Sequence, residues 1–147
     1  MDILCTHVPA VTLSLTSFDQ WLTIQEQLAG HWNKTDPTFA NDYQAMQQYF
    51  ASITSESNGW MWDGRRCGDS EFVFDLATRL RNIVVEQVDT AVNRPTQFNR
   101  RGEMVCYFAA FAIVSLIQRF VVCAHGTMGH QQIESLLAKR FSKVDSQ

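Results

Sequence analysis

The stretch Met104–Ile117 has the sequence MVCYFAAFAIVSLI and follows the polar segment Phe98–Glu103, FNRRGE. This apolar run is shorter than the roughly 20 residues that a helix needs to cross a bilayer. Because it is apolar on every side, we predict a helix buried at the centre of a small soluble protein. We expect the helix to span Asn99–Cys123, with Phe111 and Ile113–Ile117 in the core.

Length and charge restrict the class of protein. The chain has 147 residues and a net charge of −3, and it has no block of more than two Lys or Arg residues. The length predicts one domain, residues 1–147, with residues 1–16 and 142–147 as flexible ends. The charge pattern argues against nucleic-acid binding. The four cysteines form no Cys-x-x-Cys pair, which is typical of reduced, intracellular thiols.

Periodicity, caps and chain breakers predict an all-α fold with five helices. The first begins at Ser17 and ends near Gly30 to Asn33. The second begins at Asp36-Pro37, a cap followed by proline at the first helical position. A glycine-containing loop follows at Ser55–Asp69. The third helix begins near Glu71 and stops before Pro95, the central helix follows, and a last helix lies beyond Gly129.

The sequence lacks recognisable catalytic motifs. His125 and His130 do not have the spacing that places two metal ligands on one helix face, and no phosphate-binding loop or nucleophile elbow is present. We therefore expect function to depend on a surface. Apolar stripes on two helices that flank a buried hairpin predict a hydrophobic groove, which binds one amphipathic helix.

The start of the central helix carries a family resemblance. Gly102, Met104, Val105, Cys106, Tyr107 and Phe108 follow the rhythm of Gly-Arg-Ile-Val-Ala-Phe-Phe, the first homology motif of the Bcl-2 family of apoptosis regulators. From about Ser17 to Leu137 the chain resembles a divergent viral member of that family. Its second helix occupies the place of the family's third homology motif but lacks the Gly-Asp pair of that motif.

The resemblance implies a bundle of helices around a central hydrophobic helix, with a surface groove. In the family this groove captures the Bcl-2 homology 3 helix of pro-death partners such as Bim, Bak or Bax. The resemblance then implies an apoptosis inhibitor that acts in the host-cell cytoplasm and is associated with mitochondria. We also expect no cofactor, no enzymatic activity and a tendency to form homodimers. The expected groove residues are Met46, Phe50, Ile53, Leu76, Leu80, Ile83, Arg100, Arg101, Gly102, Val105 and Phe108.

One position departs from the family pattern. Glu103 replaces the arginine that follows the motif glycine and pairs with an aspartate of the ligand in the family. We expect Arg100 or Arg101 to take over this pairing, because an arginine side chain is long enough to absorb a shift of one or two positions.

Two alternatives remain open at the level of sequence. The first is a scaffold of the same fold with a filled groove, which binds signalling adaptors through its outer faces. The second is a small helical enzyme whose active site lies in the charged loop Gly59–Asp69, which contains Asp63, Arg65 and Arg66.

Overall fold

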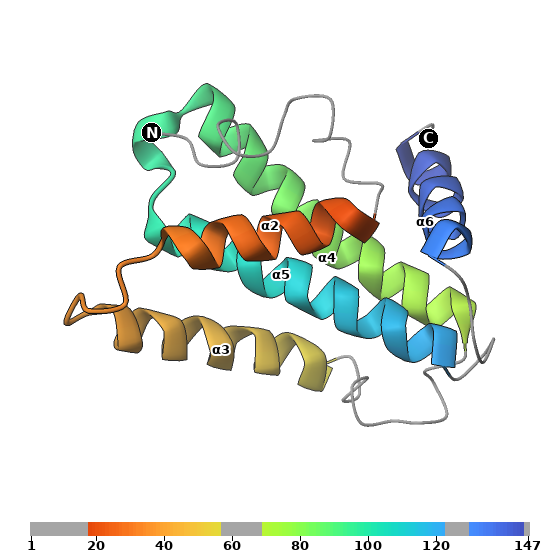
Figure 1. Cartoon of the computed structure of the whole chain (residues 1–147), viewed down its shortest axis with the longest axis horizontal. Helices are drawn as coiled ribbons and strands as arrows, with labels where there is room; N and C mark the ends of the chain where they lie inside the picture. Colours follow the sequence, from red (N-terminus) through yellow and green to blue (C-terminus); the bar gives the residue numbers. More distant parts are fainter. Residues whose placement is uncertain (1–17, 57–68, 123–129, 146–147) are drawn as a thin grey trace.

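A computed structural model describes residues 18–56, 69–122 and 130–145 of the chain. This part of the protein contains no strand, which confirms the all-α prediction. Consecutive long helices alternate in direction, and the last helix lies across one end of the bundle (Figure 1). The helices are α2 (Phe18–His31), α3 (Phe39–Glu56), α4 (Ser70–Asn93), α5 (Arg100–Phe120) and α6 (His130–Asp145), with a short 3-10 helix η2 (Pro95–Gln97) between α4 and α5.

Helix α5 is the centre of the bundle. Asn99 caps its start, where the side-chain oxygen accepts a hydrogen bond from the backbone N–H of Gly102 at 3.2 Å. In the described residues α5 is the one helix long and apolar enough to span a membrane, yet 61% of its most apolar window is buried. Its neighbours α2, α3 and α4 pack around it (Figure 1). Such burial is typical of a core helix.

The prediction that Phe111 lies in the core was wrong, because this residue is 47% exposed. Phe111 shares a face with Gln118 and Val122, both exposed, because residues seven and eleven positions apart on a helix lie on one side. The helix therefore has one uncovered face. Ile113, Val114, Leu116 and Ile117 are buried as expected, and Ser115 is half-buried.

Local signals set both ends of α4. Asp69 caps its start, and the carboxylate accepts hydrogen bonds from the N–H groups of Glu71 at 3.1 Å and Phe72 at 3.3 Å. The helix ends at Asn93, two residues before Pro95, as predicted. Helix α4 runs antiparallel to α5, and the two helices pack against each other (Figure 1).

Helix α3 begins two residues later than the Asp36-Pro37 signal predicts. Asp36 instead closes a turn, in which its carboxylate accepts a hydrogen bond from the N–H of Thr38 at 2.9 Å. At its other end α3 continues to Glu56 and so includes the first two residues of the predicted loop. The remainder of that loop up to residue 68, including Asp63, Arg65 and Arg66, lies outside the described residues.

Helix α6 closes one end of the core. Its buried Phe141 packs edge-on against Trp21 of α2, with ring centroids 6.4 Å apart. The Glu134 carboxylate accepts hydrogen bonds from the N–H groups of Phe18 at 3.1 Å and Asp19 at 2.8 Å, which satisfies donors at the start of α2. The helix runs to Asp145, so residues 142–145 are helical, while residues 1–16 lie outside the described part.

Candidate functional site

The predicted groove residues of α3 lie against α5. Met46 and Phe50 are buried, and the Phe50 ring stacks on that of Phe108 with centroids 5.8 Å apart and planes 24° apart. Tyr43 adds a second ring beside Phe108, at 4.9 Å. The structure thus brings Met46, Phe50 and Phe108 together as part of the core. The side chain of Ile53 lies outside the described part of the chain.

The predicted groove residues of α4 are similarly covered. Leu76 and Leu80 are almost fully buried, whereas Ile83 is half-buried and packs at the edge of the core. Val105 of α5 is half-buried in the same way. In this structure the predicted groove is therefore filled by the chain's own side chains, except along its edge.

Gly102 lies against the end of α4 and the segment before α5. A Cβ atom at this position would meet the Gln87 Oε1 atom at 2.8 Å and the Phe98 ring at 3.0 Å. Glycine thus permits a close approach of the chain's own side chains. A larger residue at Gly102 would have to displace Gln87 or Phe98 before it reached a ligand.

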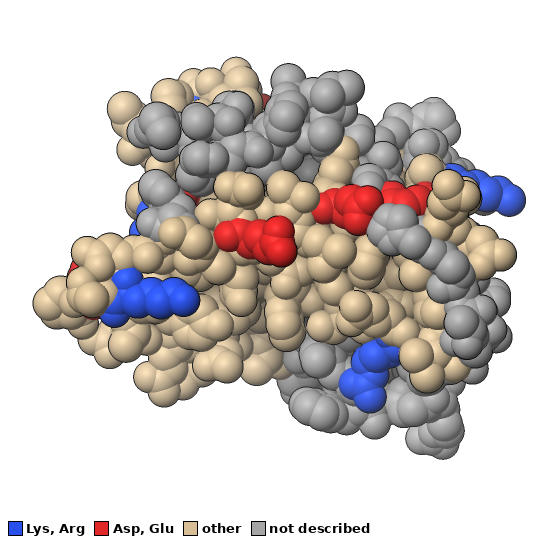
Figure 2. Space-filling view, in the orientation of Figure 1, with Lys and Arg blue, Asp and Glu red and all other residues tan. Residues whose placement is uncertain are grey.

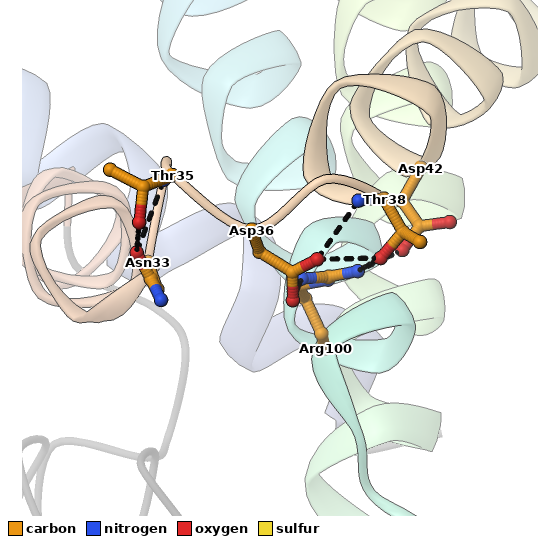
Figure 3. Close-up of polar contacts among 6 residues, drawn as sticks. All are labelled: Asn33, Thr35, Asp36, Thr38, Asp42 and Arg100. Carbon is orange, nitrogen blue, oxygen red and sulfur yellow. Dashed lines mark hydrogen bonds and ion pairs between the residues drawn. The ribbon is translucent and has the colours of Figure 1, made fainter.

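Arg100 binds residues at the start of α3. Its guanidinium donates hydrogen bonds to the carboxylate of Asp36 at 2.8 Å, to the hydroxyl of Thr38 at 2.7 Å and to the carboxylate of Asp42 (Figure 3). The guanidinium also lies over the Phe39 ring, 5.8 Å from its centroid. We call Arg100, Asp36, Thr38 and Asp42 the arginine clamp, because it fastens the first turn of α3 to the start of α5.

The arginine clamp shifts the pKa values of Asp36 and Arg100. Hydrogen bonds from the backbone and side chain of Thr38, followed by that from Arg100, lower the pKa of Asp36. Hydrogen bonds to Asp42 and then to Asp36 raise the pKa of Arg100. The guanidinium of Arg100 thus favours the charged form of Asp36.

Arg101 differs from its neighbour. Its side chain is exposed, and it forms no ion pair with any residue that the structure describes. Of the two arginines predicted to meet a ligand, Arg100 is thus already paired with two carboxylates of the chain, whereas Arg101 is accessible.

A pocket of about 250 Å³ opens beside the arginine clamp, where the end of α2, the connection to α3 and the middle of α5 meet. Burial, followed by Tyr43, raises the pKa of Tyr107 in its wall. Sequence reasoning missed this pocket, although aromatic residues on both sides of the turn before α3 are a signal for it. The pocket is lined by Ala29, Trp32, Lys34, Phe39, Tyr43 and Tyr107.

Comparison of the chain with models of protein families, with curated proteins and with solved structures gives no match.

Proposed function

We propose that this chain is a Bcl-2-like, non-enzymatic inhibitor of apoptosis that binds the Bcl-2 homology 3 helix of pro-death proteins such as Bim, Bak or Bax. Its place of action is the host-cell cytoplasm, at mitochondria. The all-helical bundle around a buried α5 supports this proposal. The resemblance of Gly102–Phe108 to the first homology motif is the reason for proposing this family.

The way in which α3 is attached carries the proposal. Among the described helices, α3 packs mainly on α5 and lies at the margin of the bundle (Figure 1). It contacts α5 through a stripe with the spacing i, i+4, i+7 and i+11, which is how an amphipathic helix binds in a groove. The stripe consists of Phe39, Tyr43, Met46 and Phe50.

A ligand helix therefore needs α3 to move outward before it can reach the face of α5. Met46 and Phe50 are buried in the absence of a ligand, so the open state is a minor one. The apparent affinity is reduced by the fraction of molecules that are open. We accordingly expect weaker binding, or binding to fewer death ligands, than is usual for the family.

Arg101 is the residue that we propose to pair with the aspartate of the ligand. Arg100 is held by two carboxylates and Glu103 is buried, whereas Arg101 is exposed. Titration calorimetry with a panel of Bcl-2 homology 3 peptides tests the function. A double-mutant cycle between Arg101→Ala and alanine at the ligand aspartate should give a coupling of about 0.2–1 kcal/mol, as for exposed ion pairs.

Arg79→Ala is the matched control for this cycle, because Arg79 is also an exposed arginine on a helix. It should show no coupling. Absence of binding to every peptide of the panel would reject the proposed function. Binding with zero coupling at Arg101 would retain the function and leave recognition to apolar contacts.

A filled-groove scaffold is the second candidate, and the burial of Met46, Phe50, Leu76 and Leu80 favours it. In this version α3 stays closed and adaptor proteins bind the outer faces. The panel of death peptides separates the two candidates, because a scaffold binds none of them.

A further inference from the structure

The open pocket beside the arginine clamp is lined mainly by aromatic rings. Trp32 is at their centre, with its ring centroid 5.8 Å from that of Phe39, 6.4 Å from that of Tyr43 and 5.1 Å from that of Tyr107. A volume of about 250 Å³ is below the roughly 300–1,000 Å³ of pockets that hold a whole small molecule. This space suits one large side chain, and none of the pocket residues belongs to the predicted groove.

Trp32, which lines the pocket, carries a buried donor. The Trp32 side chain is 8% exposed, and its Nε1–H has no hydrogen-bond partner among the described residues. Buried tryptophan N–H groups usually have a partner. The Nε1–H of Trp21 is also unpaired, but Trp21 is fully buried in the core beside Phe141 and lines no described pocket.

The rim of the pocket carries a cation. Lys34 is exposed and forms no ion pair with any residue in the described ranges. The nearby carboxylates of Asp36 and Asp42 are held by Arg100 (Figure 3). Figure 2 shows basic atoms over the connection between α2 and α3, set in mostly uncharged surface. A ligand at this pocket thus meets aromatic walls and one accessible donor, the Lys34 ammonium.

We propose that this pocket binds one large apolar side chain, preferably aromatic, from a partner protein in which a carboxylate lies next to that side chain. The aromatic walls contact the ring, and the carboxylate pairs with Lys34. Aromatic walls alone would also suit an alkylammonium group, but Lys34 repels a cation and so favours the acid.

Matched peptides test this site on the full chain. The probe is acetyl-Gly-Glu-Phe-Gly-amide, with lysine in place of glutamate in one control and glycine in place of phenylalanine in the other. The ¹⁵N–¹H signals of the tryptophan indoles report binding, and Trp32→Phe assigns the Trp32 signal. We expect the probe to shift the Trp32 indole signal with saturation, because Trp32 lines the pocket. The probe should leave the Trp21 signal unchanged and bind more tightly than either control.

Lys34→Gln should weaken the binding of this probe about two- to fivefold, as for an exposed ion pair. Lys139→Gln, which removes an exposed lysine on α6, is the control and should leave binding unchanged. A Trp32 signal that does not respond at millimolar probe would overturn the proposal. Tighter binding of the lysine peptide would also overturn it, because that result indicates a cation site. A shift of the Trp32 signal when the chain alone is concentrated would overturn it as well, because that result indicates a second copy of the chain as the occupant.

The two proposals share Phe39 and Tyr43, which line the pocket and also belong to the stripe that joins α3 to α5. Their tests nevertheless give separate results. Binding of the death peptides without binding of the acidic probe would support the proposed function and reject the pocket proposal. Binding of the acidic probe without binding of any death peptide would support the pocket proposal and reject the proposed function.

Discussion

The two sides of α5 are covered in different ways. On one side α2 and α4 bury aliphatic side chains such as Ile24, Leu80 and Val84 almost completely. On the other side α3 rests on α5 through aromatic rings, above all the stacked pair Phe50 and Phe108, and through the arginine clamp. Both contacts belong to one core, but the second joins α5 to a helix at the margin of the bundle.

This difference suggests that α3 opens before the remainder of the bundle unfolds. Elements with few neighbours open locally at a lower free energy than the core does. The same motion is what a ligand helix needs in the proposed function. Substitutions on the two sides of α5 should accordingly have different consequences, even when the replaced side chains are buried to a similar degree.

Leu80→Ala should have the largest effect. Leu80 is 1% exposed between α4 and α5, so its truncation leaves a cavity that the packed helices cannot close. We expect a loss of about 3–5 kcal/mol in the free energy of unfolding, measured by denaturant titration. Phe111→Ala is the contrasting variant, since nearly half of that side chain is already in solvent, and it should stay close to wild type. Equal losses for the two variants would contradict the described burial.

Phe50→Ala should have a smaller and more local effect. The loss of global stability is limited because α3 can detach while α2, α4, α5 and α6 remain packed. We expect about 1–2 kcal/mol in denaturant titration. Amide hydrogen exchange should accelerate in α3 and not in α4. Faster exchange in both helices would show that α3 unfolds only together with the core.

Short-range signals made much of the fold predictable. The capping residues Asp69 and Asn99 and the helix breaker Pro95 act within a few positions of themselves, and the structure has helix boundaries at all three. Asp36 shows the limit of this reasoning. An Asp-Pro pair is compatible with both a helix start and a turn. Here the Thr38 N–H donates a hydrogen bond to the Asp36 carboxylate, which stabilises the turn.

The candidate site was less predictable because it joins distant parts of the chain. Arg100 is 64 positions from Asp36 and 58 from Asp42, so no local pattern pairs them. The aromatic stripe of α3 was visible, but spacing cannot tell whether a stripe meets a ligand or the protein's own core. The same holds for Phe111, since an apolar run does not show which of its faces lacks a neighbouring helix.

Acidification should release α3 through the arginine clamp, with the smallest effect of the three. The pKa of Asp36 is lowered in the folded chain by Thr38 and Arg100, below its ordinary value of 3.8. A group with a lowered folded pKa stabilises the folded state above its unfolded pKa, and this contribution is lost as the pH falls through the folded pKa. In wild type, α3 amides should therefore lose protection relative to those of α4 between about pH 5 and pH 2.

In Asp36→Asn the carboxylate is absent, so α3 should start with lower protection at pH 6 and change less on acidification. Asp19→Asn, at an exposed position on α2, controls for the general change in charge. If wild type and Asp36→Asn lose α3 protection in parallel, Asp36 does not hold the helix, and the attachment of α3 to α5 depends on the aromatic stripe alone.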